Sequence, residues 1–279
     1  MAKSALDPHD GQKPSIVWSY FVLTRLHKFP AGSNLAFWPG AWGITLSAFR
    51  VGMTIEQALI QLGMYLLGCT LCHSAGCIWN DICDREFDRK VAVSLHGAVF
   101  LLAVLVALWM VTLSFAGHNG IKVGLFGFLS LVPWYPLMKR WTYWPQAFLG
   151  LAMTWALPTS WASINGFTDV SIPTVLLAGG ISWTIYYDTI YACQDRGDDI
   201  QAGVKSTAVL FGSHMRSILC AFASGFVMAL VYTGVATGAS TAYFIVTVLM
   251  TALELAWQMY ILDFTNEAQC WKVFKVSNM

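Results

Sequence analysis

The chain has few charged side chains: Lys, Arg, Asp and Glu make up only 11% of its 279 residues, whereas 57% are hydrophobic. An ordinary soluble domain carries roughly 25% charged residues. Because a folded domain of this size leaves much of its surface in water, this composition excludes an ordinary soluble enzyme. With a mean hydropathy of +0.58, the chain is predicted to be all-α and polytopic in a membrane.

Excess positive charge is also lacking, since the net charge is only +1. Nucleic-acid binding needs a basic stripe or patch, so this class is excluded. The seven cysteines are odd in number and lie mostly in apolar runs, which excludes a secreted disulfide scaffold. The polar N-terminal stretch has no apolar signal-peptide core and few arginines, so neither a secretory signal nor a transit peptide is predicted.

Long apolar runs fill the rest of the chain. A membrane-spanning helix takes about 20 mostly apolar residues. On this rule eight spans are predicted, at residues 33–50, 56–79, 96–115, 121–138, 146–163, 172–191, 209–235 and 239–262. Residues 1–279 are interpreted as one transmembrane domain, with a polar cytoplasmic N-terminal segment (1–30) and a C-terminal tail (263–279).

Eight spans distribute the basic residues very unequally between the two membrane sides. Of the sixteen Lys and Arg residues, only Arg50 and Lys122 fall on one side, and the other fourteen fall on the opposite side. Cytoplasmic loops carry the excess of Lys and Arg, so the richer side is predicted to be cytoplasmic. Two acidic clusters, after the second and sixth spans, fall on this same side.

The acidic clusters have the spacing of one helix face. Asn80, Asp84 and Asp88 are four residues apart, as are Asp195 and Asp199. Like charges at this spacing repel each other, and a bridging divalent cation reverses that effect. Oxygen ligands suit Mg²⁺, which also binds substrate phosphates. A solvated loop is the alternative, but acids at the ends of apolar helices are costly and tend to be functional.

Basic residues accompany these acids on the same predicted side. They are Arg25, Lys28, Lys139, Arg140 and Lys205. Together they are candidates to clamp a diphosphate whose oxygens also bind Mg²⁺. Each also has a purely topological explanation, because cytoplasmic loops are positive whatever the protein does.

Four segments then resemble the signatures of a known family. They read Asn80-Asp-x-x-Asp84-x-x-x-Asp88, Tyr135-Pro-x-x-Lys139-Arg140, Tyr187-Asp-Thr-x-Tyr-Ala-x-x-Asp195-x-x-Asp198-Asp199 and Gly203-Val-Lys-Ser-Thr207. In combination they are similar to the motifs of the UbiA-type intramembrane aromatic prenyltransferases. The segment 28–43, KFPAGSNLAFWPGAWG, looks most like the fungal members that prenylate phenolic acids in meroterpenoid pathways, often with a farnesyl donor.

The resemblance implies nine membrane helices around a central cavity, Mg²⁺ as cofactor, and transfer of a prenyl group from a polyprenyl diphosphate to an aromatic acceptor. Asp84, Asp88, Asp195 and Asp199 are implied to be catalytic and, with Asn80, to ligate the metal. The diphosphate is implied to bind Asn80 and the five basic residues Arg25, Lys28, Lys139, Arg140 and Lys205.

The chain departs from the family pattern in two places. Residues 88–92 lead almost directly into the next span, where the family has an R-x-x-x-R-P-L-x-x-G segment. The family also continues into a further helix beyond the position of Met279, so the tail is interpreted as truncated. A truncated, non-catalytic homologue that still binds prenyl diphosphate is therefore one alternative function.

Two other functions remain open. A ubiquinone-pathway 4-hydroxybenzoate polyprenyltransferase shares the motifs, although the missing transit peptide favours the endoplasmic reticulum or Golgi. A transporter is expected to spread charge through the bundle, whereas this sequence confines charge to one face. No protein partner is predicted. The haem-like spacing Cys69-Thr-Leu-Cys72-His73 lies inside a span and is interpreted as helix packing.

Overall fold

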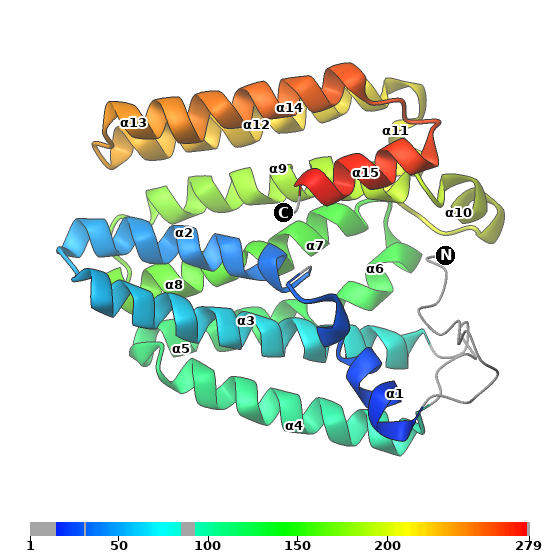
Figure 1. Ribbon diagram of the computed structural model, residues 1–279, viewed down its shortest axis with the longest axis horizontal. Helices are drawn as coiled ribbons and strands as arrows, with labels where there is room; N and C mark the ends of the chain where they lie inside the picture. The colour runs from blue at the N-terminus through cyan, green and yellow to red at the C-terminus, as the bar shows by residue number, and fades with distance from the viewer. Residues whose placement is uncertain (1–14, 31, 85–92, 278–279) are drawn as a thin grey trace.

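The computed structural model describes residues 15–30, 32–84 and 93–277, and within these ranges the chain is helical with no β-strand. Long helices run side by side as a bundle (Figure 1). The outermost layer at one edge is the hairpin that ends in α14, and α4 lies at the opposite edge. The predicted all-α fold class is confirmed.

The helices of the first half are α1 (Ile16–Leu23), η1 (Leu26–Lys28), α2 (Ser33–Val51), α3 (Ile55–Cys83), α4 (Leu95–Ser114), α5 (Gly117–Leu131) and α6 (Tyr135–Trp141). Those of the second half are α7 (Pro145–Thr154), α8 (Ala156–Asn165), α9 (Ser171–Ala192), α10 (Arg196–Ala202), α11 (Thr207–Phe211), η2 (Gly212–His214), α12 (Met215–Ala236), α13 (Thr241–Tyr243), the π-helical η3 (Phe244–Leu249), α14 (Met250–Ile261) and α15 (Glu267–Ser277).

Side-chain caps fix where several of these helices begin. At the start of α3, Thr54 accepts a hydrogen bond from the Gln57 amide while the Gln57 side chain accepts one from the Thr54 amide. Ser94 and Ser206 cap α4 and α11 in the simpler way, each accepting from an amide three residues later. These contacts satisfy amide groups that the first turn of a helix leaves unpaired.

The predicted spans are helical, but the number of uninterrupted spans is smaller than predicted. Four helical stretches are long and apolar enough to cross a membrane alone: Ile55–Cys83, Leu95–Ser114, Thr207–Ala236 and Thr241–Ile261. Helices α5 and α6 make a fifth if their 40° bend is included in one span. Pro133 lies in that bend, and its missing N–H breaks the helix predicted over 121–138. The count of eight spans is therefore not confirmed.

Two short helices lie where the sequence analysis expected none. Helix α1 falls within the segment interpreted as polar, and α15 falls within the tail 263–279. Helix α15, the red helix of Figure 1, lies along the end of α9. It therefore adds a wall beside the signature carried by α9.

Small residues let the helix backbones approach closely. A Cβ on Gly43 of α2 would lie 2.8 Å from the Leu157 carbonyl oxygen of α8 and closer still to Ser160 Oγ. Outward-facing side chains, in contrast, are large and apolar: Phe100, Val235 and Tyr260 are 72%, 70% and 82% exposed. A bundle packed through small residues with an apolar outer surface is typical of a membrane protein.

Candidate active site

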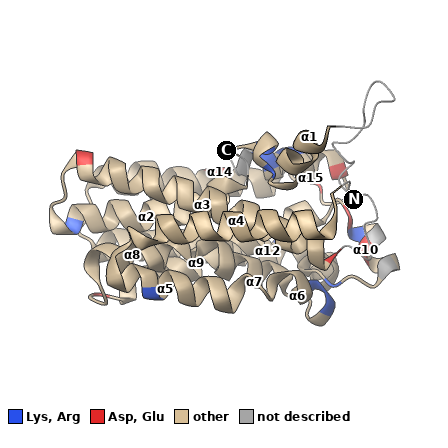
Figure 2. Cartoon of the chain, turned by 90° about the horizontal axis from the view of Figure 1, so that it is seen from below, with Lys and Arg blue, Asp and Glu red and all other residues tan. Residues whose placement is uncertain are grey.

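Charged side chains gather at one end of the bundle. Figure 2 shows most blue and red segments near α1, α6 and α10, with few along the length of the helices. Helix α3 ends in this region at Cys83, and Asp84 caps it. The structure thus collects most of the described charged residues at one end of the bundle.

Asp84 is the acid most closely held by other groups. The side-chain amide of Asn80, one turn earlier on α3, donates to Asp84 Oδ2 over 3.2 Å. Lys139 Nζ of α6 donates to the same oxygen over 2.5 Å, and Arg140 Nη2 lies 3.5 Å from Asp84 Oδ1. The C-terminus of a helix carries a partial negative charge, so a carboxylate placed there is repelled. Lys139 and Arg140 offset this partial charge and the charge of Asp84.

One oxygen of Asp84 accepts no hydrogen bond from the described residues, although Arg140 Nη2 lies 3.5 Å from it. Asp84 Oδ1 is buried, and no group in the described part of the chain donates a hydrogen bond to it. An ionised carboxylate accepts several hydrogen bonds or ligates a metal. The geometry therefore leaves an acceptor pointing into the charged end of the bundle.

Arg25 and Lys28 lie on the approach to α2 and differ in their surroundings. Arg25 Nη2 forms an ion pair with Asp81 Oδ1 over 2.8 Å, and the Arg25 backbone is left-handed with φ of 61°. Lys28, three residues later in η1, is exposed. Arg25 therefore joins the acidic cluster through Asp81, an acid to which the sequence analysis gave no role.

The second signature begins in the last turns of α9, and the segment after it folds against the end of α6. Asp195 precedes α10, and Asp199 lies within it. The chain then returns, and the Lys205 amide donates to the Lys139 carbonyl oxygen over 3.1 Å. Lys205 Nζ donates to the Trp141 carbonyl oxygen over 3.4 Å. Lys139 thus links the two signatures, with its side chain on Asp84 and its backbone on the loop after Asp199.

The loop 203–207 is also anchored from beneath. Thr207 Oγ1 lies 2.6 Å from Thr189 Oγ1 of α9, and the Thr207 amide donates to Gln146 Oε1 of α7 over 3.1 Å. All three side chains are buried. This explains the Ser-Thr that closes the signature, which the sequence analysis quoted without assigning a role.

Sequence reasoning missed a polar layer deeper in the bundle. Asp188 lies within α9, one turn before that helix ends at Ala192, whereas Asp195 lies in the turn that follows. Asp188, Asp84 and Cys77 all lie near enough to Tyr135 to act on it electrostatically. The signal in the sequence was an acid inside an otherwise apolar predicted span, since such residues tend to be functional.

The comparisons with known proteins decide the family. The model of the UbiA prenyltransferase family matches residues 36–279. The chain belongs to this family. It is 39% identical to the UbiA prenyltransferase claS of Ampulloclitocybe clavipes over 97% of this chain and 90% of that protein. It is 36% identical to the mitochondrial 4-hydroxybenzoate polyprenyltransferase of Caenorhabditis elegans over 92% of this chain and 73% of that protein.

Solved UbiA structures share the fold. A UbiA homologue from Aeropyrum pernix K1 matches with a TM-score of 0.73 and 19% identity, over 88% of this chain and 92% of that one. A UbiA homologue from Archaeoglobus fulgidus bound to GPP and Mg²⁺ matches with a TM-score of 0.66 and 16% identity, over 93% and 95% of the two chains. These structures show the fold of the chain, and the family model and the curated relatives identify it as a prenyltransferase.

The metal-ligating residues predicted for this UbiA chain are only partly assembled. Asn80 and Asp84 are in contact, Asp195 and Asp199 lie at the start of α10, and Asp88 lies outside the described residues. Within the described ranges, no three His, Cys, Asp or Glu side chains converge as a metal cluster. The oxygen donors, among them Asp84 Oδ1, which accepts no hydrogen bond from the described residues, nevertheless fit a hard cation that takes its remaining ligands from substrate and water.

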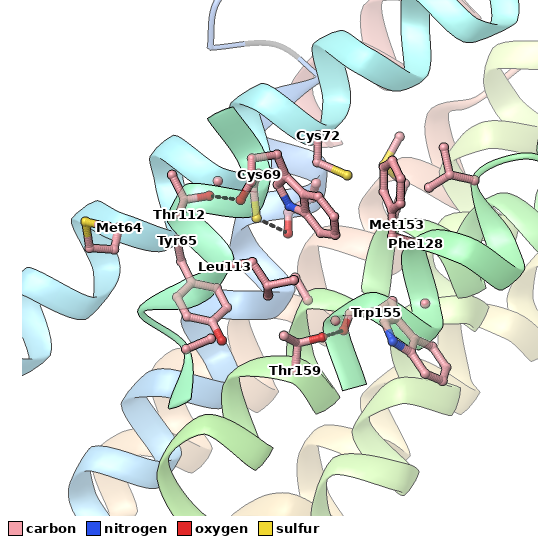
Figure 3. Close-up of a pocket in the computed structure, with 18 of the residues that line it drawn as sticks. Met64, Tyr65, Cys69, Cys72, Thr112, Leu113, Phe128, Met153, Trp155 and Thr159 are labelled. Carbon is pink, nitrogen blue, oxygen red and sulfur yellow. Dashed lines mark hydrogen bonds between the residues drawn. The ribbon is translucent and has the colours of Figure 1, made fainter. Parts of the chain in front are cut away.

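An apolar cavity of about 110 Å³ lies deeper in this UbiA bundle, between α3, α4, α5, α7 and α8. Figure 3 shows Tyr65, Cys69 and Cys72 of α3, Leu113 of α4, and Phe128 of α5 around it. Cys69 Sγ donates to the Ala36 carbonyl oxygen over 3.5 Å. Both cysteines of the haem-like motif therefore line an apolar cavity.

Aromatic rings of α15 cover the outer side of the second signature. The ring of Phe274 lies 4.6 Å from that of Tyr191 and 6.1 Å from that of Tyr187, and Trp271 stacks on Phe274 at 5.7 Å between ring centroids. The Tyr187 side chain is buried beneath these rings. The tail of this UbiA chain thus supplies an apolar wall next to its charged site.

Proposed function

We propose that this chain transfers a prenyl group, farnesyl by preference, from a polyprenyl diphosphate to the aromatic ring of a phenolic acid in fungal meroterpenoid biosynthesis. The observation that carries the proposal is Lys139, which pairs with Asp84 of the first signature and hydrogen-bonds through its backbone to the loop of the second. An anion bound between the two signatures would contact residues of both signatures.

The chain's own residues account for diphosphate binding and departure. Lys139 and Arg140 reach the site from α6, and Arg25, Lys28 and Lys205 approach it from two other segments. Guanidinium and ammonium groups bind diphosphate oxygens through charge-assisted hydrogen bonds, which strengthen as negative charge builds up on the leaving group. Lys139 and Arg140 form ion pairs with Asp84. Their cationic groups are therefore already held beside the proposed diphosphate site.

Magnesium belongs in the same proposal. Asn80, Asp84 and Asp88 would hold it on one side, and Asp195 and Asp199 on the other. Bound there, Mg²⁺ supplies positive charge that stabilises the departing diphosphate. The solved Archaeoglobus homologue with GPP and Mg²⁺ supports this assignment by analogy of fold.

The apolar parts of the bundle have a separate task. A prenyl chain whose diphosphate lies at Asp84 would extend toward the apolar cavity. Cys72, the cavity residue of α3 nearest to Asp84 in sequence, lies twelve residues earlier on that helix, or about 18 Å deeper. The rings of Tyr191, Trp271 and Phe274 would exclude water from the allylic carbon. Without this exclusion, water would attack that carbon in place of the acceptor. The electron-rich acceptor ring then attacks this carbon and loses a proton.

A location in the endoplasmic reticulum or Golgi, with the charged end of the bundle facing the cytoplasm, completes the proposal. The gathering of Lys and Arg at one end supports that orientation. The 4-hydroxybenzoate polyprenyltransferase activity is a second candidate, favoured by the 36% identity to the Caenorhabditis enzyme.

The test is a product assay on the full chain in microsomes with Mg²⁺ and farnesyl diphosphate. Orsellinic-type acids and 4-hydroxybenzoate are offered in parallel, and products are identified by mass spectrometry. Farnesylated orsellinic-type product is expected. Product from 4-hydroxybenzoate with a long polyprenyl donor only would favour the second candidate. Prenyl diphosphate binding with no product from any pair would indicate a non-catalytic homologue.

Asp84→Asn is the decisive variant, and Glu56→Gln is its matched control. Glu56 is an exposed acid at the opposite end of the same helix. Asp84→Asn is expected to abolish product while the protein still folds, and Glu56→Gln is expected to retain it. Equal turnover in the two variants would refute the assigned site.

A further inference from the structure

A second pocket, of about 440 Å³, lies at the loop ends of α12 and α14, and its lining joins apolar side chains with two arginines. Its wall combines Arg196 at the start of α10, Ser213 in the turn before α12, Arg216 in the first turn of α12, and the segment 263–265 after α14. None of these residues was assigned to the diphosphate site. We propose that this pocket binds a phosphate group, as carried by the headgroup of a membrane phospholipid.

Arg196 lines this pocket, and its guanidinium lies beside the turn before α12. Its Nη2 lies 4.0 Å from the position that a Cβ on Gly212 would take, which places the guanidinium against the turn before α12. Its Nε is buried, and across the described residues no acceptor hydrogen-bonds to it. A buried N–H without an acceptor is costly, and a bound anion would satisfy it.

Arg216 contributes further donors. Its two terminal nitrogens donate to the carbonyl oxygens of Met259 and Leu262, the second over 2.6 Å, at the end of α14. A guanidinium has five N–H donors, so this capping leaves three of them for a ligand. The planar fork of arginine matches the geometry of phosphate oxygens.

The charge of the pocket selects among phosphate compounds. Arg196 and Arg216 bring two positive charges, and Asp263 brings one negative charge. The Thr265 amide and hydroxyl donate to Asp263 Oδ1 over 2.9 and 2.7 Å, and these hydrogen bonds lower the pKa of Asp263, which keeps it ionised. One net positive charge matches a phosphodiester, which carries one negative charge, better than a phosphomonoester, which carries about 1.5 to 2 at neutral pH.

The position of the pocket also favours a lipid. The stretches that contain α12 and α14 are both long and apolar enough to span a membrane. Trp257 and Tyr260, in the last turns of α14, are 57% and 82% exposed. Exposed Trp and Tyr at the end of a membrane helix mark the depth of the lipid headgroups. A phosphate entering the pocket from the bilayer surface would meet the arginines at that depth.

The experiment measures binding to the full chain, purified in detergent and depleted of lipid. Short-chain phosphatidylethanolamine is the probe, the matching diacylglycerol lacks the phosphate, and thermal unfolding and native mass spectrometry are the readouts. The phospholipid is expected to raise Tm and to remain bound, whereas the diacylglycerol does neither. Arg196→Gln is expected to weaken binding about tenfold or more, the usual loss for a charge-assisted hydrogen bond.

Lys122→Gln is the matched control. It removes the same charge from an exposed site on α5, on the sparsely charged side, and should bind like the original chain. Inorganic phosphate is a separate arm: an Arg196-dependent shift at lower concentration than the lipid would support the site but assign it to a soluble anion. Equal phospholipid binding by the original chain and Arg196→Gln, or an equal shift with diacylglycerol, would overturn the proposal.

Discussion

Replacement of Lys139 by Gln tests the centre of the proposed mechanism. The change removes the Nζ that lies 2.5 Å from Asp84 Oδ2, but keeps a polar side chain of similar length. Arg140 remains 3.5 Å from the other carboxylate oxygen, so Asp84 keeps one cationic neighbour. The backbone hydrogen bond from Lys205 to residue 139 does not depend on the side chain and is expected to persist.

The effect on stability should be small. The Lys139 side chain is 39% exposed, so solvent screens the pair strongly. Exposed ion pairs contribute about 0 to 1 kcal/mol, and a loss within that range is expected. A change of this size lowers Tm by only a few degrees in a domain of this length.

The effect on turnover should be much larger. A hydrogen bond to a charged group contributes about 1.5 to 3 kcal/mol, and the one from Lys139 to the leaving diphosphate gains strength in the transition state. With tenfold in rate for each 1.4 kcal/mol, kcat should fall about 10- to 100-fold.

The assay compares farnesyl transfer and Tm for Lys139→Gln, Lys122→Gln and the original chain. Lys122→Gln removes an exposed lysine of α5 and should leave both values unchanged. If Lys139→Gln turns over like the original chain, the Asp84 ion pair is only structural and the reasoning fails. A stability loss large enough to explain the rate would refute it equally.

Three further predictions follow from the same geometry. Removal of divalent cations with EDTA should abolish product, and added Mg²⁺ should restore it; turnover that persists in EDTA would remove the metal from the proposal. Phe274→Ala opens the wall beside Tyr191, so the ratio of prenyl alcohol to prenylated product should rise, and an unchanged ratio would assign that ring to packing alone. Gly43→Ala places a methyl 2.8 Å from the Leu157 carbonyl oxygen and should cost about 1 to 3 kcal/mol, measured by thermal unfolding. Gly63→Ala, whose Cβ would have nothing within 4 Å, should be close to neutral.

The extent of helix was predictable because apolar run length is a local property. The predicted spans 56–79 and 96–115 correspond to α3 (Ile55–Cys83) and α4 (Leu95–Ser114). Hydropathy failed where continuity depends on the backbone. The span predicted over 121–138 breaks near Pro133, which lacks the N–H that would continue the helix.

The candidate site was predictable where spacing carries the information. The four-residue interval between Asn80 and Asp84 placed them on one helix face, and their side chains are hydrogen-bonded. Asp188 shows the limit of this reasoning. It lies on a helix that reads as an apolar span, and only packing of α6 against neighbouring helices brings Tyr135 near it. Whether Asp88 completes the first signature stays a prediction, because it lies outside the described residues.

The sequence by itself determined that this protein lies in a membrane, that its chemistry-bearing groups share one surface, and that its motifs are those of a UbiA prenyltransferase. These properties follow from the composition, from the alternation of loops between the two membrane sides, and from the short spacing of motif residues. Each of these is a property of the linear sequence. Only the tertiary structure decided that Lys139 joins the two signatures, that α15 covers Tyr191, and that Arg196 and Arg216 line one pocket. Such contacts join residues tens of positions apart, and only the packing of helices determines which side chains meet.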